Sequence, residues 1–228
     1  MKNKLVVVFD LDDTLYYEID FLKSAYKEIA IFIKEKEDLT IGEDVIYLSM
    51  LHFYNKGGNA FSNIIGKYGG SSITIKDLLY LYRNHKPAIQ LSSGTVEVLN
   101  FLNQKKISIG LITDGRSIQQ RSKIEALGLN HYLKHIIISE EFGSEKPSKE
   151  NYVFFENKYK GSHFMYVGDN VKKDFITPNK LGWYTVCLRD KEGLNVHSQN
   201  IEIPKEYKPQ FKIDTIVELK DLIVSLQV

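Results

Sequence analysis

The most informative segment for the fold of this chain is Leu5-Val6-Val7-Val8-Phe9-Asp10-Leu11-Asp12-Asp13-Thr14. Its first five residues form an unbroken apolar run, of the length expected for a strand buried on both faces of a parallel sheet. Acidic residues at the carboxyl end of such a strand lie at the crevice where open α/β sheets bind ligands. Strand alternation places Asp10 and Asp12 on the same side. Two adjacent carboxylates repel unless a cation or a proton lies between them, so the pair predicts a functional site. The plainer alternative is a solvated acidic turn that closes the strand.

The composition limits the classes of partner. The chain has 228 residues, is 43% hydrophobic and carries a formal net charge of +1. This length suits one large domain, or a domain with a smaller insert. The small net charge gives no reason to expect nucleic acid or an anionic membrane surface as a partner.

Cysteine content and hydropathy indicate the compartment. The one cysteine, Cys187, cannot form an internal disulfide, which fits a reducing cytosol. No segment approaches the roughly 18 consecutive apolar residues that a membrane helix needs. We therefore expect a cytoplasmic protein with no membrane association, and take a monomer or a dimer as the default.

Strand and helix patterns alternate regularly from about residue 87 onward. The patterns predict helices at 92–106, 118–127, 149–159 and 171–181, and strands at 107–113, 135–139, 163–167, 183–188 and 211–213. Such alternation is typical of βαβ units. The predicted fold class is therefore α/β, with a doubly wound parallel sheet.

The segment 16–86 interrupts this alternation. Residues 19–35 and 43–54 have helical periodicity, and no convincing strand follows either of them. We interpret 16–86 as a helical insert after the first strand, with 1–15 and 87–228 forming the core. Tyr16, Tyr17 and Glu18, just past the first motif, are the best candidates for the hinge and for cap contacts.

A second polar group follows the strand predicted at 107–113. Thr113-Asp114-Gly115 offers a hydroxyl and a glycine at the mouth of the next helix, where backbone N–H groups and the helix dipole favour an anion. The plainer alternative is that Thr113 and Asp114 only cap the helix.

Two further strand ends carry charged groups. Asp169 follows the strand at 163–167, and Asp174 can converge with it from the first turn of the next helix. With Asp10 and Asp12 they form a set of oxygen ligands suited to Mg²⁺. Lys146, after the strand at 135–139, could balance this negative charge and hold a phosphate as a point charge.

In order and spacing, these motifs resemble the four motifs of the haloacid dehalogenase-like hydrolases. The resemblance rests on Asp10-Leu-Asp12-Asp-Thr14, then Thr113, Lys146, and Gly168-Asp169 with Asp174. It implies a Rossmann-like fold and chemistry through an aspartyl-phosphate. It also implies that the insert is the helical cap of the family's phosphatase branch, similar to phosphoglycolate phosphatases.

The resemblance also implies a role for each motif residue. Asp10 would be the nucleophile, and Asp12 the general acid and then the general base. Thr113 and Lys146 would be catalytic residues that bind the phosphoryl group, with Asp114 and Gly115 in the same binding loop. Mg²⁺ would be held by Asp10, the backbone carbonyl of Asp12, and Asp169, with Asp174 in support.

Asp12 favours a phosphatase within this family. The dehalogenases that gave the family its name have no aspartate two positions after the nucleophile, whereas a leaving alcohol needs such an acid. The leading hypothesis is a Mg²⁺-dependent phosphomonoester hydrolase acting on a small soluble phosphorylated metabolite. A phosphomutase acting on a sugar phosphate is the second hypothesis, and a non-enzymatic binding protein with the same fold is the third.

Overall fold

The chain divides into two compact units. The computed structural model describes residues 4–70 and 72–226. One unit takes in the chain up to Glu18 and from Gln90 onward, and the other runs from Ile19 to Ile89. The sequence analysis placed the insert at 16–86. The outer bounds that it gave the core, residues 1 and 228, lie outside the described residues.

A six-stranded sheet forms the first unit. In chain order its strands are β1 (Leu5–Phe9), β2 (Ser108–Thr113), β3 (His135–Ile138), β4 (His163–Gly168), β5 (Tyr184–Leu188) and β6 (Phe211–Ile213). They lie in the order β3-β2-β1-β4-β5-β6, and every neighbouring pair is parallel. The predicted doubly wound parallel sheet is thus confirmed. The chain reverses its winding direction at β1, which is where such sheets open a crevice for ligands.

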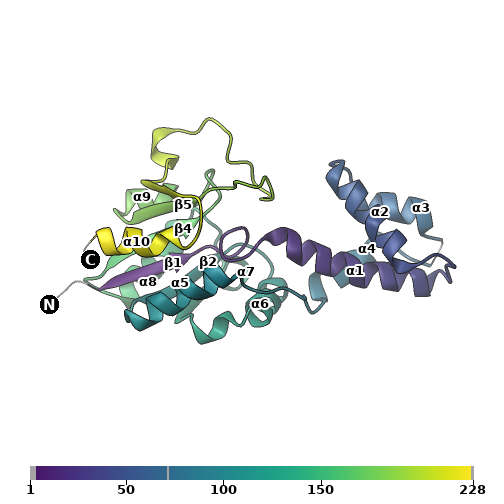
Figure 1. The fold of residues 1–228 in the computed structure, drawn as a ribbon, viewed down its shortest axis with the longest axis horizontal. Helices are drawn as coiled ribbons and strands as arrows, with labels where there is room; N and C mark the ends of the chain where they lie inside the picture. Colours follow the sequence, from purple (N-terminus) through teal and green to yellow (C-terminus); the bar gives the residue numbers. More distant parts are fainter. Residues whose placement is uncertain (1–3, 71, 227–228) are drawn as a thin grey trace. The chain divides into compact units, whose positions relative to one another are not determined.

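Helices cover this sheet (Figure 1). They are α5 (Ser93–Gln104), α6 (Ser117–Ala126), α7 (Ser139–Phe142), α8 (Lys149–Lys158), α9 (Ile176–Lys180) and α10 (Glu218–Ser225). Short 3-10 turns occur at Leu129–His131 and Lys205–Tyr207. Helix α5 contacts β2 and α10, and α8 contacts α9. All five residues of β1 are buried, which is what its unbroken apolar sequence predicts.

The helix predicted at 171–181 is shorter than expected. Residues 171–175 form turns, and α9 spans only Ile176–Lys180. The backbone N–H of Asp174 donates to the carbonyl of Asn170, and the N–H of Asn170 donates to Asp174 Oδ2, both at 2.9 Å. The first of these bonds spans four residues, as the bond of a helical turn does, and the second ties the Asp174 side chain back to Asn170. The second bond holds the Asp174 carboxylate close to the end of β4.

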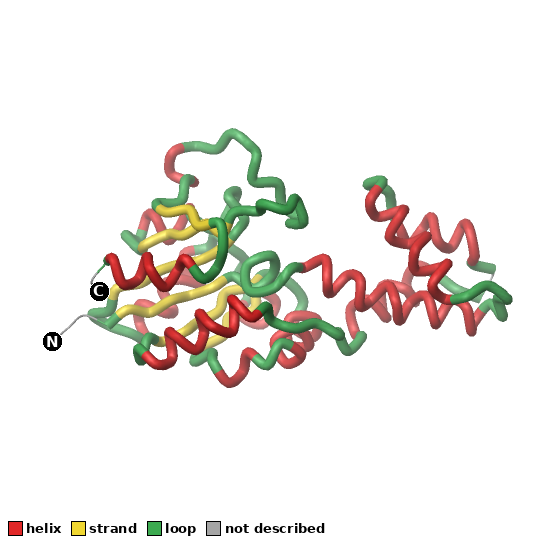
Figure 2. Tube along the Cα trace, viewed as in Figure 1, coloured by secondary structure: helices red, strands yellow, loops and turns green. Residues whose placement is uncertain are grey.

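The second unit is helical (Figure 2). It contains α1 (Glu18–Lys36), α2 (Glu43–Asn55), α3 (Ala60–Tyr68) and α4 (Ile75–Asn84), and none of its described residues lies in a strand. The apolar faces of these helices enclose a separate core that includes Ile29, Ile46 and Ile64. Across 4–70 and 72–226, no helix is long and apolar enough to cross a membrane.

Candidate active site

A pocket of about 150 Å³ opens at the carboxyl ends of the central strands. It receives side chains from the residues that follow β1, β2 and β4 and from the segment after β3. Its lining is almost entirely charged or polar: Asp10, Asp12, Asp13, Glu18, Thr113, Asp114, Lys146, Asp169, Asn170, Lys173 and His197. The structure thus brings residues of all four predicted motifs to this pocket, whereas the predicted site residues Gly115 and Asp174 are not among those that line it.

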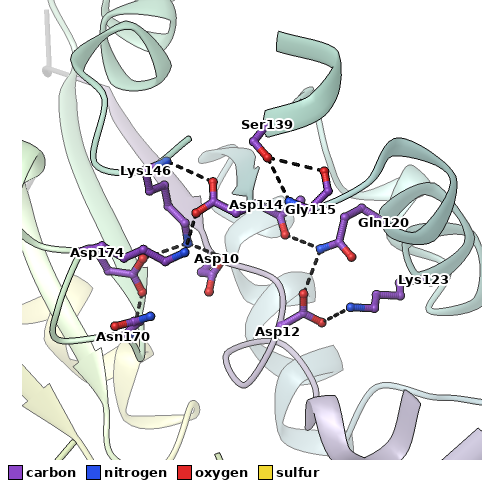
Figure 3. Close-up of polar contacts among 12 residues, drawn as sticks. Asp10, Asp12, Asp114, Gly115, Gln120, Lys123, Ser139, Lys146, Asn170 and Asp174 are labelled. Atoms are coloured by element: carbon purple, nitrogen blue, oxygen red, sulfur yellow. Dashed lines mark hydrogen bonds and ion pairs between the residues drawn. The ribbon is translucent and has the colours of Figure 1, made fainter. Parts of the chain in front are cut away.

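Lys146 lies between two carboxylates at the base of this pocket (Figure 3). Its ammonium donates to Asp10 Oδ1 at 2.6 Å and forms an ion pair with Asp174 Oδ1 at 2.8 Å. Burial alone would lower the pKa of Lys146, but the two carboxylates outweigh burial and hold that pKa well above its ordinary value. Lys146 is therefore a permanent cation beside Asp10.

Three buried carboxylates meet beside this lysine. Oxygen atoms of Asp10, Asp169 and Asp174 lie within 4.8 Å of one another. Burial raises the pKa of Asp10 to about 7 against the opposing charge of Lys146. Burial, followed by repulsion from Asp174 and Asp10, raises the pKa of Asp169 to about 9.

Burial is the largest cause of both raised pKa values, and repulsion among the three carboxylates, which face the single ammonium of Lys146, adds to it. An all-oxygen set of buried carboxylates suits Mg²⁺, which binds through one or two carboxylates and retains waters. The residues present therefore fit the ion that the sequence predicted. The cluster contains Asp174 directly, whereas the sequence analysis gave Asp174 a supporting position.

The Asp12 carboxylate is directed toward α6 (Figure 3). Lys123 donates to its Oδ1 at 2.7 Å and Gln120 to its Oδ2 at 2.9 Å. The Tyr16 hydroxyl also donates to Oδ1, at 2.5 Å. Burial would raise the pKa of Asp12, but Lys123 and these hydrogen bonds outweigh it, so the pKa is lowered and Asp12 is a carboxylate in this state.

The residues after β2 serve different purposes. Thr113 lines the pocket, and its Oγ1 accepts a hydrogen bond from Gln120 at 2.6 Å. The Asp114 carboxylate accepts from the Lys146 backbone N–H at 3.0 Å and pairs with Lys173 at 2.5 Å. Asp114 therefore fixes the segment that carries Lys146. The N–H of Gly115 donates to Ser139 Oγ at 2.9 Å, so that N–H is already used within the protein.

Several residues around the pocket escaped the sequence analysis. The segment between β5 and β6 reaches the site, because Asn195 donates to Asp169 Oδ2 at 2.9 Å and the Val196 N–H donates to Asp13 Oδ2 at 2.8 Å. The sequence analysis likewise gave Gln120 and Lys123 no role in the site. The segment 189–210 has no period and no motif, so no local signal could have placed it here. For Lys123, the sequence signal that could have found it was a lysine in a predicted helix whose neighbours are buried.

Comparisons with known proteins agree with this geometry. The family model of haloacid dehalogenase-like hydrolases matches residues 7–187. The chain is 28% identical over 236 residues to the glyceraldehyde 3-phosphate phosphatase of Methanocaldococcus jannaschii, covering 97% of each chain. It is 26% identical to the ribulose-1,5-bisphosphate 5-phosphatase of Halopiger xanaduensis, covering 95% of this chain and 98% of that protein.

A solved structure supports the fold independently. The crystal structure of Bacillus subtilis YfnB bound to magnesium superposes with a TM-score of 0.66 at 21% identity. The superposition covers 97% of this chain and 99% of YfnB. At this level of identity the likeness establishes the fold.

Proposed function

Since the chain belongs to the haloacid dehalogenase-like hydrolase family, we propose that it is a Mg²⁺-dependent phosphatase of small phosphorylated metabolites. It would act through an aspartyl-phosphate on Asp10. The observation that carries this proposal is the pairing of Asp10 with the buried ammonium of Lys146 at 2.6 Å, in a pocket that Asp12 also lines. A carboxylate can attack an anionic phosphate only if nearby cations offset the repulsion.

In the first step an oxygen of Asp10 attacks the phosphorus, and the bond from phosphorus to the substrate's alcohol oxygen breaks. Lys146 and Thr113 hold the phosphoryl oxygens during this transfer. Asp12 supplies the proton that the departing alcohol takes up. An approaching phosphate anion raises the pKa of a nearby carboxyl, which allows Asp12 to carry that proton.

In the second step Asp12, now a carboxylate, takes a proton from a water molecule, and the water oxygen attacks the phosphorus. The phosphorus–Asp10 bond breaks, which releases phosphate and restores both aspartates. The donors from Tyr16, Gln120 and Lys123 favour the ionised form that this step requires. The covalent intermediate divides one difficult hydrolysis into two easier transfers.

The metal would be held by Asp10 and Asp169, with Asp174 beside them and the backbone carbonyl of Asp12 as a further ligand. When bound, Mg²⁺ neutralises charge on the phosphoryl oxygens. The excess of buried carboxylate at this position supports the assignment.

The names of the relatives support a proposal for the substrate class. Two of them are named for glyceraldehyde 3-phosphate and ribulose-1,5-bisphosphate, so we expect a phosphorylated sugar of similar size. We assign the helical unit, Ile19–Ile89, as the cap that selects this substrate.

The test is phosphate release from p-nitrophenyl phosphate and from a panel of sugar phosphates, with and without Mg²⁺. Asp10→Asn removes the nucleophile, and we expect it to lower kcat by at least about 10³-fold. Asp221→Asn makes the same chemical change at an exposed position of α10 and should retain wild-type activity. Release that persists in Asp10→Asn would show that Asp10 is not the nucleophile.

A further inference from the structure

Lys123 on α6 is a buried lysine to which the steps above give one effect only, to favour the ionised form of Asp12. Its side chain is 1% exposed, although lysine is almost never fully buried unless it is paired. Its ammonium lies 2.7 Å from Asp12 Oδ1 and 3.7 Å from Glu18 Oε1. Lys146 pairs with Asp10 and Asp174, so the two buried lysines pair with different carboxylates.

Gln120 lies one turn before Lys123 on the same helix. Its amide donates to Asp12 Oδ2 at 2.9 Å and to Thr113 Oγ1 at 2.6 Å. Since Lys123 holds the other oxygen of Asp12, the carboxylate is fixed at both ends and cannot rotate freely. The amide also occupies an acceptor position of the Thr113 hydroxyl, which leaves the hydroxyl's proton available to an incoming phosphoryl oxygen.

The buried ion pair of Lys123 and Asp12 is not expected to exist for stability alone. Desolvation makes a buried ion pair roughly neutral, or even unfavourable, relative to well-packed apolar side chains. In contrast, a fixed acid gains rate from orientation, because small misplacement of a catalytic group can cost about 10²-fold in rate.

We propose that Lys123 and Gln120 are positioning residues, which orient the Asp12 carboxylate toward the leaving oxygen and couple it to Thr113. This proposal rests on the proposed phosphatase function. Lys123 itself does not touch substrate. Lys123 acts through Asp12, so the loss of Lys123 should lower the rate most for substrates whose leaving group most needs a proton.

The experiment measures kcat/KM for a series of substituted phenyl phosphates, from p-nitrophenyl phosphate to phenyl phosphate. This constant reports steps up to the first phosphoryl transfer, so it excludes hydrolysis of the intermediate. We expect Lys123→Met to lower kcat/KM at least about tenfold more for phenyl phosphate than for p-nitrophenyl phosphate. Gln120→Leu should shift the dependence in the same direction, and Lys180→Met, at an exposed position of α9, should leave it unchanged.

A double-mutant cycle completes the test. In an Asp12→Asn background, Lys123→Met should cause no further loss with phenyl phosphate, because residues that act through one group are not additive. Equal losses for all leaving groups, or full additivity with Asp12→Asn, would overturn the proposal. If circular dichroism shows that Lys123→Met does not fold, Gln120→Leu replaces it in both measurements, the leaving-group series and the double-mutant cycle. Wild-type protein that hydrolyses no phosphomonoester would instead refute the proposed function.

Discussion

At the scale of single residues, the pocket depends on short carboxylates that must lie close together. Gly168 permits this at the end of β4, because a Cβ atom on it would lie 2.4 Å from Asp174 Oδ2. Asp174 is fully buried and paired with Lys146, so it has little room to move away. The glycine is therefore part of the acidic cluster although it offers no ligand.

We predict that Gly168→Ala weakens Mg²⁺ binding by displacing the Asp174 carboxylate. Overpacking of a buried position should also lower the free energy of unfolding by about 1–3 kcal/mol. Calorimetric titration with Mg²⁺ and urea denaturation measure the two effects. Gly66→Ala, in α3 where an added Cβ meets nothing within 4 Å, should leave Mg²⁺ affinity unchanged. Unaltered affinity in Gly168→Ala would mean that Asp174 does not contribute to the site.

At the scale of elements, aromatic packing joins the edge strand β3 to helix α8. The ring of His135 on β3 lies 5.6 Å from that of Phe154 and 5.7 Å from that of Tyr159, centroid to centroid. Burial, followed by the charge of Lys158, lowers the pKa of His135. This direction of shift favours the neutral form of the ring.

We predict that the His135 ring protons titrate with a pKa below 6.5, the ordinary histidine value. Because the pKa of His135 is lower in the folded than in the unfolded protein, protonation of the ring destabilises the folded state. The stability that the neutral ring provides is therefore present above about pH 6.5 and is lost as the pH falls through the folded pKa. Nuclear magnetic resonance titration measures it, with His135→Gln to assign the signal. A pKa at or above the ordinary value would contradict the packing of β3 on α8.

At the scale of the whole molecule, the fold accumulates negative charge at one edge of the sheet. Four strand ends converge there, and the Asp169 carboxyl has its pKa raised to about 9. An acid with a raised pKa in the folded state costs stability as the pH rises above the ordinary aspartate value. The negative charge at this site therefore destabilises the folded, metal-free protein, and a bound cation would neutralise that charge.

Mg²⁺ should accordingly stabilise the protein against heat. Binding to the folded state alone adds about 2.7 kcal/mol at 100 times the dissociation constant. We expect Asp169→Asn to abolish this increment and to stabilise the metal-free protein by more than about 1 kcal/mol, because it removes a buried repulsion. Differential scanning calorimetry with EDTA or Mg²⁺ measures both. A metal-free variant less stable than metal-free wild type would show that Asp169 is not under electrostatic strain.

Local patterns in the sequence were sufficient to predict the class of fold and the family. The buried run Leu5–Phe9 and the alternation after residue 87 predicted the parallel sheet, and the strand ends at Asp10, Thr113 and Asp169 identified the family, both now confirmed. These signals are local: strand periodicity and turn chemistry act over a few residues. The helix predicted at 171–181 was too long: residues 171–175 form turns, and α9 spans only Ile176–Lys180.

The side chains that complete the pocket could be identified only from the tertiary structure. Lys123 meets Asp12 across 111 positions, and Val196 meets Asp13 across 183. Neither contact has a local pattern, because it depends on how α6 and the segment after β5 pack at the strand ends. Sequence spacing fixes which face of an element a residue occupies, whereas the partner of that face is set by packing of the whole sheet.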